Sequence, residues 1–304
     1  MDITGLESIV YGVEDMEACK RFNADFGLEQ VEANSKGAVF QTVEGSTVVL
    51  RDIRDPSLPA AVTPGPQLRQ VIWGVSSKKV LDAVGAELSK DRAVKQGADG
   101  ILWSTDTMGY AIGFRLKQVK DIAVEPLATN VPGRPSRINT RFKFSERPKV
   151  LHLGHVVFYT PNLEETYAFY RDRLGFKLSD TFVNGVGYFL RSGVTHDHHS
   201  IFMLHLGDMK GLNHASYQVR NFDDIAVAGE YLEKKGWKSL TGPGRHHIGS
   251  NYFWYFHSPC GGAVEYHSDI DYLTDDWQPR EWEFRPDVAA AWDRGPGFAG
   301  EAKK

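Results

Sequence analysis

Hydrophobic and polar positions follow the same order in two distant parts of the chain. An apolar stretch, a polar turn and an amphipathic stretch make up residues 8–22, SIVYGVEDMEACKRF, and again residues 155–169, HVVFYTPNLEETYAF. Alternating apolar positions predict a strand, and apolar positions three or four apart predict a helix. In the second copy this spacing predicts a helix over 163–173, with Asn162 as its N-cap. Each stretch is therefore a strand followed by a helix.

The correspondence continues along both halves of the chain. Segments LRQVIWGV and LNHASYQV (68–75 and 212–219) both predict a strand followed by a helix, and TDTMGYAIGFR and HSPCGGAVEYH (105–115 and 257–267) both predict a glycine turn leading into a strand. The predicted helices lie near 78–89 and 223–235, and the predicted strand pairs lie in 37–50 and 185–206. We therefore predict four copies of a strand–helix–strands unit, two in each half.

These elements predict an α+β fold in two domains. A length of 304 residues suits two domains of ordinary size. A segment with four prolines, about 118–148, is expected to connect them, which gives an N-terminal domain of residues 1–139 and a C-terminal domain of residues 140–304. Beyond residue 270 the chain is rich in Trp and Pro, and we expect this tail to pack onto the body of the protein.

Composition excludes several classes of protein. Apolar residues make up 41% and charged residues 24% of the chain, as in soluble globular proteins. A net charge of −4 gives no basic surface for nucleic acid, and no apolar run reaches the roughly 20 residues that span a membrane. Cys19 and Cys260 do not make a disulfide framework, and the first residues do not resemble a signal peptide. We therefore expect a cytoplasmic protein.

The histidines are confined to one half of the chain. All eleven lie after residue 151, at 152, 155, 196, 198, 199, 205, 214, 246, 247, 257 and 267. A distribution this uneven favours a histidine-built site in the C-terminal half over unrelated structural histidines.

Alignment of the two halves identifies candidate metal ligands. Three aligned positions hold two imidazoles and a carboxylate in the C-terminal half: His155, His214 and Glu265. The N-terminal half holds no such set there: Ser8, Gln70 and Gly113. Two imidazoles and a carboxylate on one face of an octahedron leave adjacent positions open, which is typical of non-haem Fe(II) enzymes that bind substrate and dioxygen together. The same ligands also serve Mn(II), so both ions stay open.

Four segments of the C-terminal half resemble a known family. They are LGHVVFYTPNLEETYAFYRDRLGF, HDHHSIFMLH, LNHASYQV and GPGRHHIGSNYFWYFHSPCGGAVEYHSDID. They are similar to the type I extradiol dioxygenases, which cleave catechol rings and belong to the vicinal oxygen chelate superfamily. The resemblance covers nearly the whole chain and is specific in the second half. It implies four βαβββ modules in two barrel-like domains, with the metal site in the C-terminal domain.

The resemblance also implies roles for individual residues. It makes His155, His214 and Glu265 the ligands of Fe(II), with Mn(II) as the other ion. His199 matches the family's acid–base histidine, and its neighbour His198 has a less defined role. His246 and Tyr255 match groups that contact the substrate hydroxyl and the oxygen-derived species. The implied reaction inserts both atoms of O2 into a small catecholic substrate beside its diol, in aromatic compound degradation, and the implied assembly is a homo-oligomer.

Other interpretations of these residues stay open at this stage. A glyoxalase-like isomerase or lyase would have the same architecture, and a small-aromatic binding protein would lack the ligands. Taken alone, Tyr255 fits an ordinary strand aromatic, and His246 and His247 fit a glycine-rich turn. We interpret His205 and Cys260 as structural, and Asp197 as an exposed loop carboxylate, with the orientation of a histidine as its alternative role. Candidates for lining the cavity or the core are Phe182, Tyr188, Phe189 and Phe202.

Overall fold

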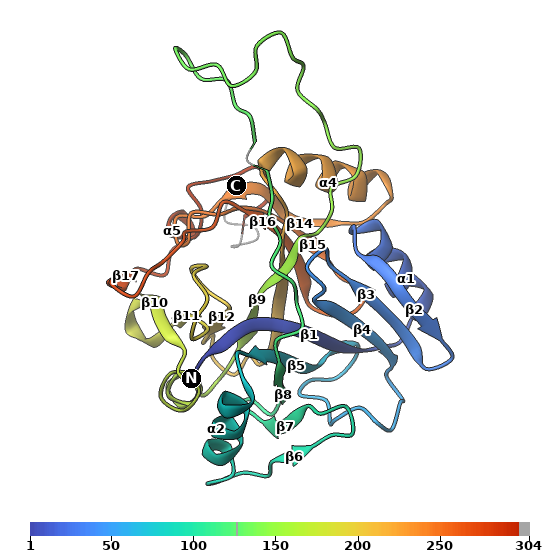
Figure 1. Ribbon diagram of the computed structural model, residues 1–304, viewed down its shortest axis with the longest axis vertical. Helices are drawn as coiled ribbons and strands as arrows, with labels where there is room; N and C mark the ends of the chain where they lie inside the picture. The colour runs from blue at the N-terminus through green and yellow to red at the C-terminus, as the bar shows by residue number, and fades with distance from the viewer. Residues whose placement is uncertain (126, 298–304) are drawn as a thin grey trace.

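Strands predominate over short helices in the protein (Figure 1). The computed structural model describes residues 1–125 and 127–297, so the end of the predicted tail lies outside the described residues. The N-terminal half contains β1 (Ile3–Val13), α1 (Met16–Asp25), β2 (Glu29–Asn34), β3 (Gly37–Gln41), β4 (Thr47–Asp52), β5 (Gln67–Val75), α2 (Lys78–Leu88), β6 (Lys95–Gln96), β7 (Leu102–Thr105) and β8 (Ala111–Leu116).

The C-terminal half repeats this order and adds a tail. It contains β9 (His152–Tyr159), α3 (Leu163–Ala168), β10 (Lys177–Phe182), β11 (Gly187–Arg191), β12 (Ile201–Leu204), β13 (Gly211–Gln218), α4 (Phe222–Lys234), β14 (Ser239–Arg245), β15 (Tyr252–His257) and β16 (Ala263–Ser268), and then β17 (Arg280–Trp282), α5 (Pro286–Ala289) and β18 (Trp292–Asp293). The predicted α+β class and the four strand–helix–strands units are confirmed.

Each half forms its own sheet, and the two sheets share one strand order. The N-terminal sheet runs β2-β3-β4-β1-β5-β8-β7-β6, and the C-terminal sheet contains the matching series β10-β11-β12-β9-β13-β16-β15-β14. The tail supplies an extra strand at each edge of the C-terminal sheet, because β17 pairs with β10 and β18 pairs with β14. The tail therefore packs onto the body where it is described, as predicted.

Strand register supports the residue-level alignment of the two halves. In the C-terminal sheet Ser216 of β13 pairs with His155 of β9 and with Glu265 of β16. In the N-terminal sheet the corresponding residue of β5, Ile72, pairs with Ser8 of β1 and with Gly113 of β8. The three positions compared in the sequence are thus structurally equivalent.

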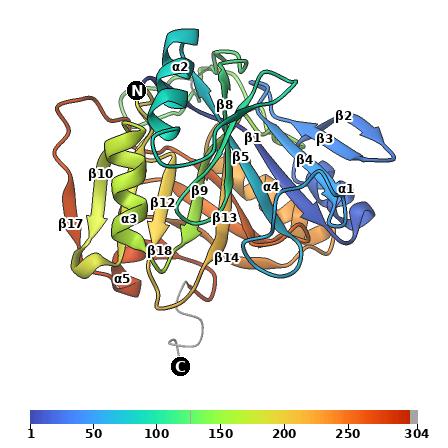
Figure 2. The same ribbon diagram turned by 90° about the horizontal axis from the view of Figure 1, so that it is seen from below.

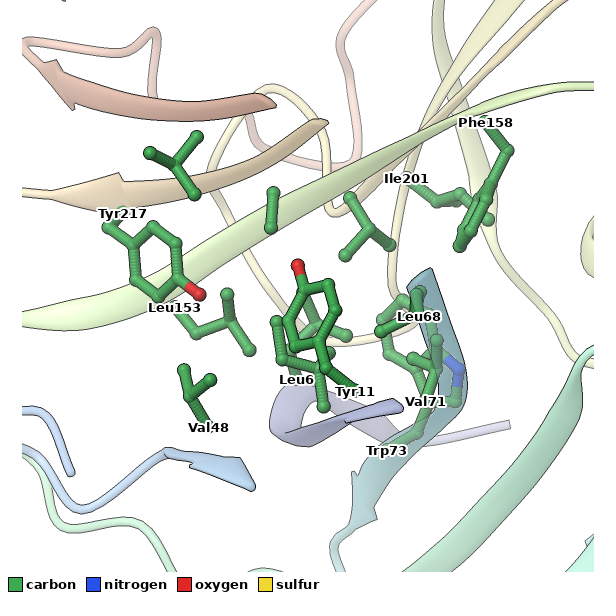
Figure 3. Packing of buried hydrophobic residues seen from close by; sticks show 14 of the residues in the cluster. Leu6, Tyr11, Val48, Leu68, Val71, Trp73, Leu153, Phe158, Ile201 and Tyr217 are labelled. Atoms are coloured by element: carbon green, nitrogen blue, oxygen red, sulfur yellow. The ribbon is translucent and has the colours of Figure 1, made fainter. Parts of the chain in front are cut away.

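The core lies between the two sheets and belongs to both (Figure 3). Tyr11 and Trp73 from the N-terminal sheet belong to the same buried cluster as Leu153, Phe158 and Tyr217 from the C-terminal sheet. Successive side chains of a strand point to opposite faces of its sheet. His155 lies three residues before Phe158 in β9, so it points to the opposite face, away from the shared core, and a register shift between His155 and Leu153 lets Leu153 stay in the core.

The connection and one helix differ in detail from the sequence predictions. Residues 118–148 contain no helix or strand in their described part, and they project past α4 (Figure 1). Figure 2 shows β17 of the tail beside β10, at the edge of the C-terminal sheet. The helix predicted over 163–173 is an α-helix only to Ala168 and continues as a π-helix over Phe169–Arg173. Asn162 occupies the N-cap position, as predicted, although its side chain makes no capping hydrogen bond. In the described residues, no helix combines the length and apolar character needed to cross a membrane.

A close helix–sheet approach yields a stability prediction. A Cβ atom on Gly229 of α4 would lie 2.1 Å from Trp254, whereas one on Gly85, which occupies the same position of α2, would meet Leu102 at 3.3 Å. Replacing Gly229 with Ala should destabilise the protein by about 1–3 kcal/mol through overpacking. Gly85→Ala should cause no such loss, because a helix gains about 0.5–1 kcal/mol from Ala. Thermal unfolding of both variants is the measurement, and equal midpoints would contradict the packing argument.

Candidate active site

A cavity of about 200 Å³ lies in the C-terminal half. All six residues for which the sequence predicts a catalytic or metal-binding role line it: His155, His199, His214, His246, Tyr255 and Glu265. Three of the predicted aromatic residues line it as well: Phe182, Phe189 and Phe202. Tyr188 does not, because its ring stacks on Tyr167 and its hydroxyl donates to Glu164.

The predicted ligand atoms converge on one point of this cavity. His155 Nε2 lies 3.1 Å and His214 Nε2 lies 3.4 Å from Glu265 Oε2, and the two nitrogens are 3.4 Å apart. Ligand atoms on one face of an octahedron lie about 3 Å apart, because bonds of roughly 2.1 Å meet there at right angles. The three side chains come from the neighbouring strands β9, β13 and β16, so the sheet itself sets their separation.

The hydrogen bonds and charges of this trio suit a divalent cation. His214 donates from Nδ1 to Asn213 Oδ1 at 2.5 Å, which leaves the Nε2 lone pair pointing at the convergence point. Burial lowers the pKa of His214, so its ring is neutral at neutral pH. Burial also opposes ionisation of Glu265, but its contacts with His155, His214 and His246 hold its pKa well below the usual range. Neutral imidazole and ionised carboxylate are the metal-binding forms.

A third histidine, His267, lies near this trio and was not assigned from the sequence. It follows Glu265 by two residues on β16. One possible ligand atom from each of His155, Glu265 and His267 lies within 4.8 Å of the other two. Its Nδ1 is hydrogen-bonded with Ser216 Oγ at 2.7 Å, and burial lowers its pKa to about 3. His267 does not line the cavity, whereas His214 does. His214 is therefore the histidine that converges with His155 and Glu265 at the cavity, and His267 lies behind them.

His199 provides a buried neutral imidazole beside the ligands. Its ring centroid lies 4.0 Å from that of His155. Burial is the main reason that its pKa lies well below the usual value. A neutral ring keeps one nitrogen lone pair, so His199 has the chemical form needed to accept a proton from a bound hydroxyl.

Tyr255 and His246 form a hydrogen-bonded pair at the cavity wall. His246 Nδ1 donates to the carbonyl oxygen of Ala289 at 2.7 Å, so its Nε2 accepts from the Tyr255 hydroxyl at 3.0 Å. Burial, with the charge of Glu265 nearby, raises the pKa of Tyr255 well above 10. Tyr255 therefore stays protonated and acts as a hydrogen-bond donor.

Sequence reasoning missed or misjudged several residues around the cavity. Asn251 donates to Glu265 Oε1 at 3.3 Å and lines the cavity, but an asparagine in a glycine-rich loop gives no signal in one sequence. Asp197 is not a free exposed carboxylate, because its Oδ2 lies 3.5 Å from His152 Nε2 and its side chain is 32% exposed. His247 is exposed, as its turn position suggested, and His205 contacts the Thr160 carbonyl oxygen outside the cavity.

The equivalent positions of the N-terminal sheet carry no such chemistry. Ser8 accepts a hydrogen bond from Thr47, and the space over Gly113 is filled by Ile101 and Trp103. A Cβ atom at Gly113 would lie 2.8 Å from Ile101. The N-terminal copy therefore packs apolar side chains where the C-terminal copy has Glu265.

Comparisons with known proteins identify the C-terminal half. Residues 152–266 match the model of the Glyoxalase/Bleomycin resistance protein/Dioxygenase superfamily. The chain is 30% identical over 198 residues to metapyrocatechase 2 of Cupriavidus necator, an alignment that covers 64% of this chain and 60% of that protein. It is 27% identical over 276 residues to the manganese-dependent 2,3-dihydroxybiphenyl 1,2-dioxygenase of Geobacillus genomosp. 3, covering 84% and 82%.

A solved structure shows the same architecture over nearly the whole chain. The Mn(II)-bound glyoxalase from Novosphingobium aromaticivorans superimposes with a TM-score of 0.76 and 25% identity, covering 99% of this chain and 93% of that one. The matched residues 152–266 contain His155, His214 and Glu265. Residues 152–266, which supply the converging side chains, are therefore similar to the Glyoxalase/Bleomycin resistance protein/Dioxygenase superfamily.

Proposed function

We propose that the protein is an extradiol dioxygenase that opens a catecholic ring beside its diol. The observation that carries this proposal is the convergence of His155, His214 and Glu265 in a cavity that also holds the neutral groups His199 and Tyr255. Two relatives with dioxygenase names support it. The chain spans 60% of the length of metapyrocatechase 2, so the proposed activity is argued from the geometry of the site as well as from the similarity in sequence.

The proposed metal is Fe(II), held by His155, His214 and Glu265. The donor set, two nitrogens and one carboxylate oxygen, also accepts Mn(II), and one relative is named as manganese-dependent. When bound, the ion would lower the pKa of the diol hydroxyls and supply the electron transfer that activates dioxygen.

The side chains of the cavity would position the substrate and move its protons. Phe189 and Phe202 stack at 3.8 Å and give the cavity an apolar wall suited to an aromatic ring. His199 would accept a hydroxyl proton and later return it, and Tyr255 would donate a hydrogen bond to a developing negative charge. The burial of these groups keeps competing water away.

The glyoxalase-like alternative is supported by one observation, the likeness to a solved Mn(II)-bound glyoxalase. We favour the dioxygenase because the cavity pairs its ligands with a buried imidazole and a buried phenol. We also propose a cytoplasmic homo-oligomer. The free thiols of Cys19 and Cys260 support a reducing compartment, and the exposed apolar side chains of Ile138 and Phe144 on the projecting connection support contact between copies.

Oxygen uptake tests the proposed reaction. The full chain is prepared without oxygen, loaded with Fe(II) and mixed with catechol, 3- and 4-methylcatechol, 2,3-dihydroxybiphenyl and a carboxylated catechol. We expect uptake matched by a yellow ring-opened product for at least one diol. No uptake with any diol, at a verified one iron per chain, would contradict the proposal and favour the glyoxalase-like alternative.

Metal binding distinguishes His214 from His267. His214→Ala removes a proposed ligand. The Fe(II) affinity of this variant should fall by more than about 100-fold, which is the upper limit for removing a residue that only supports a ligand. In His267→Ala the Fe(II) affinity should fall by no more than about 100-fold, because His267 lies behind the proposed ligands. Metal content after gel filtration and titration calorimetry measure both, and His257→Ala, on the exposed side of β15, is the control. The reverse ranking would place His267 in the ligand set.

Loss of the buried imidazole should slow turnover without loss of metal. His199→Asn removes the proton acceptor, so kcat should fall by about 10²–10⁴-fold. The content of Fe(II) should stay near one ion per chain, because His199 is outside the converging trio. A variant that loses its iron would instead show His199 to be a ligand.

A further inference from the structure

A fully buried histidine, His198, lies between His199 and a buried carboxylate. His198 Nδ1 is 3.1 Å from His199 Nδ1, and His198 Nε2 is 3.4 Å from Asp180 Oδ2. His198 does not line the cavity, and its buried Nε2 makes no hydrogen bond in the described part of the chain, so the Asp180 carboxylate acts on it by charge at 3.4 Å. Asp180, His198 and His199 thus form a continuous polar series that ends in the cavity.

The C-terminal tail holds Asp180 in place. The strand β17 runs parallel to β10 and pairs Arg280 with Asp180. The backbone N–H of Arg280 donates to Asp180 Oδ1 at 2.9 Å, and the indole N–H of Trp282 donates to Asp180 Oδ2 at 2.8 Å. Asp180 is only 2% exposed, so these donors compensate for the burial of its carboxylate.

These contacts determine which nitrogen carries the proton in each ring. A carboxylate oxygen only accepts, so its charge favours an N–H over a lone pair on the facing His198 Nε2. A neutral imidazole has one N–H and one lone pair, which leaves the lone pair of His198 on Nδ1. The facing His199 Nδ1 must then be the donor, and the lone pair of His199 lies on Nε2.

We propose that Asp180 and His198 are positioning residues that hold His199 with its proton on Nδ1, so that Nε2 faces the cavity as a proton acceptor. This inference deepens the proposed function and rests on it for its catalytic consequence. The opposite tautomer would present an N–H to a substrate hydroxyl that must lose its own proton. The charged residue that sets the tautomer is thus held by the tail, away from the ligands.

The tautomer can be observed without activity. Long-range ¹H–¹⁵N spectra of the full chain labelled with ¹⁵N-histidine, metal-free and with diamagnetic Zn(II), distinguish a protonated ring nitrogen from an unprotonated one. The signals lost in His199→Asn identify those of His199. We expect a protonated Nδ1 and an unprotonated Nε2. A protonated Nε2 with an unprotonated Nδ1 would overturn the proposal whether or not the protein is a dioxygenase.

A pair of variants tests the role of the Asp180 charge. Trp282→Phe removes one donor to Asp180 and keeps the carboxylate with its hydrogen bond from the Arg280 N–H, so the tautomer of His199 should stay as it is, and this variant is the reference for the second change. The second variant adds Asp180→Asn to Trp282→Phe, which keeps the shape of the side chain at position 180 and removes its charge. The amide oxygen would then accept from Arg280 N–H and the amide N–H2 would face His198 Nε2. The proton would then move to the other nitrogen in both His198 and His199. As a result kcat should fall by at least about 100-fold relative to Trp282→Phe.

The outcomes separate the inference from the proposed function. An inverted His199 tautomer in the double variant, with unchanged KM and metal content and a lower kcat, supports the proposal. An unchanged tautomer in the double variant overturns it, and so does an inverted tautomer with unchanged kcat. If the unaltered protein consumes no oxygen with any diol, the proposed function fails, and the ¹⁵N spectra still decide whether Asp180 sets the tautomer.

Discussion

The burial of the Glu265 carboxylate is the constraint around which the C-terminal half is built. Glu265 is 0% exposed, and an isolated charge in such a position would cost many kcal/mol. Its oxygens are instead surrounded by His155, His214 and His246 and by the amide of Asn251. These groups converge from three directions and leave one side open to the cavity, which is the arrangement that a divalent cation completes.

Strand alternation explains how a single sheet supplies both a core and a site. On β16, Val264 and Tyr266 belong to the core that both sheets share, and Glu265 and His267 alternate with them along the strand. In the N-terminal sheet Gly113 occupies the position equivalent to Glu265, and Ile101 and Trp103 fill the space over it. The two halves therefore share one backbone plan, and the difference in chemistry rests on which side chains occupy the inward positions.

The repeat made the strand order and the three converging residues predictable. His155, His214 and Glu265 are far apart in the sequence, but each stands at a landmark of the repeated unit, and register in a sheet moves in whole residues. Asp180 had no such signal, because its partners come from β17, a hundred residues later, in a tail that has no counterpart in the first half. The N-cap position of Asn162 was predictable for the opposite reason, because the preference of Asn for helix N-termini is local.

The tail supplies or contacts the groups that orient two of the four histidines lining the cavity, His246 and His199. The carbonyl oxygen of Ala289, in α5, orients His246, and Arg280 and Trp282, in β17, hold the carboxylate that faces His198. Phe284, between these two elements, lines the cavity itself. Displacing this segment would free His246 and Asp180 together, because the groups that hold both belong to it. The two extra edge strands therefore have a physical role, since β17 and β18 fix the segment between them to the sheet that holds the site.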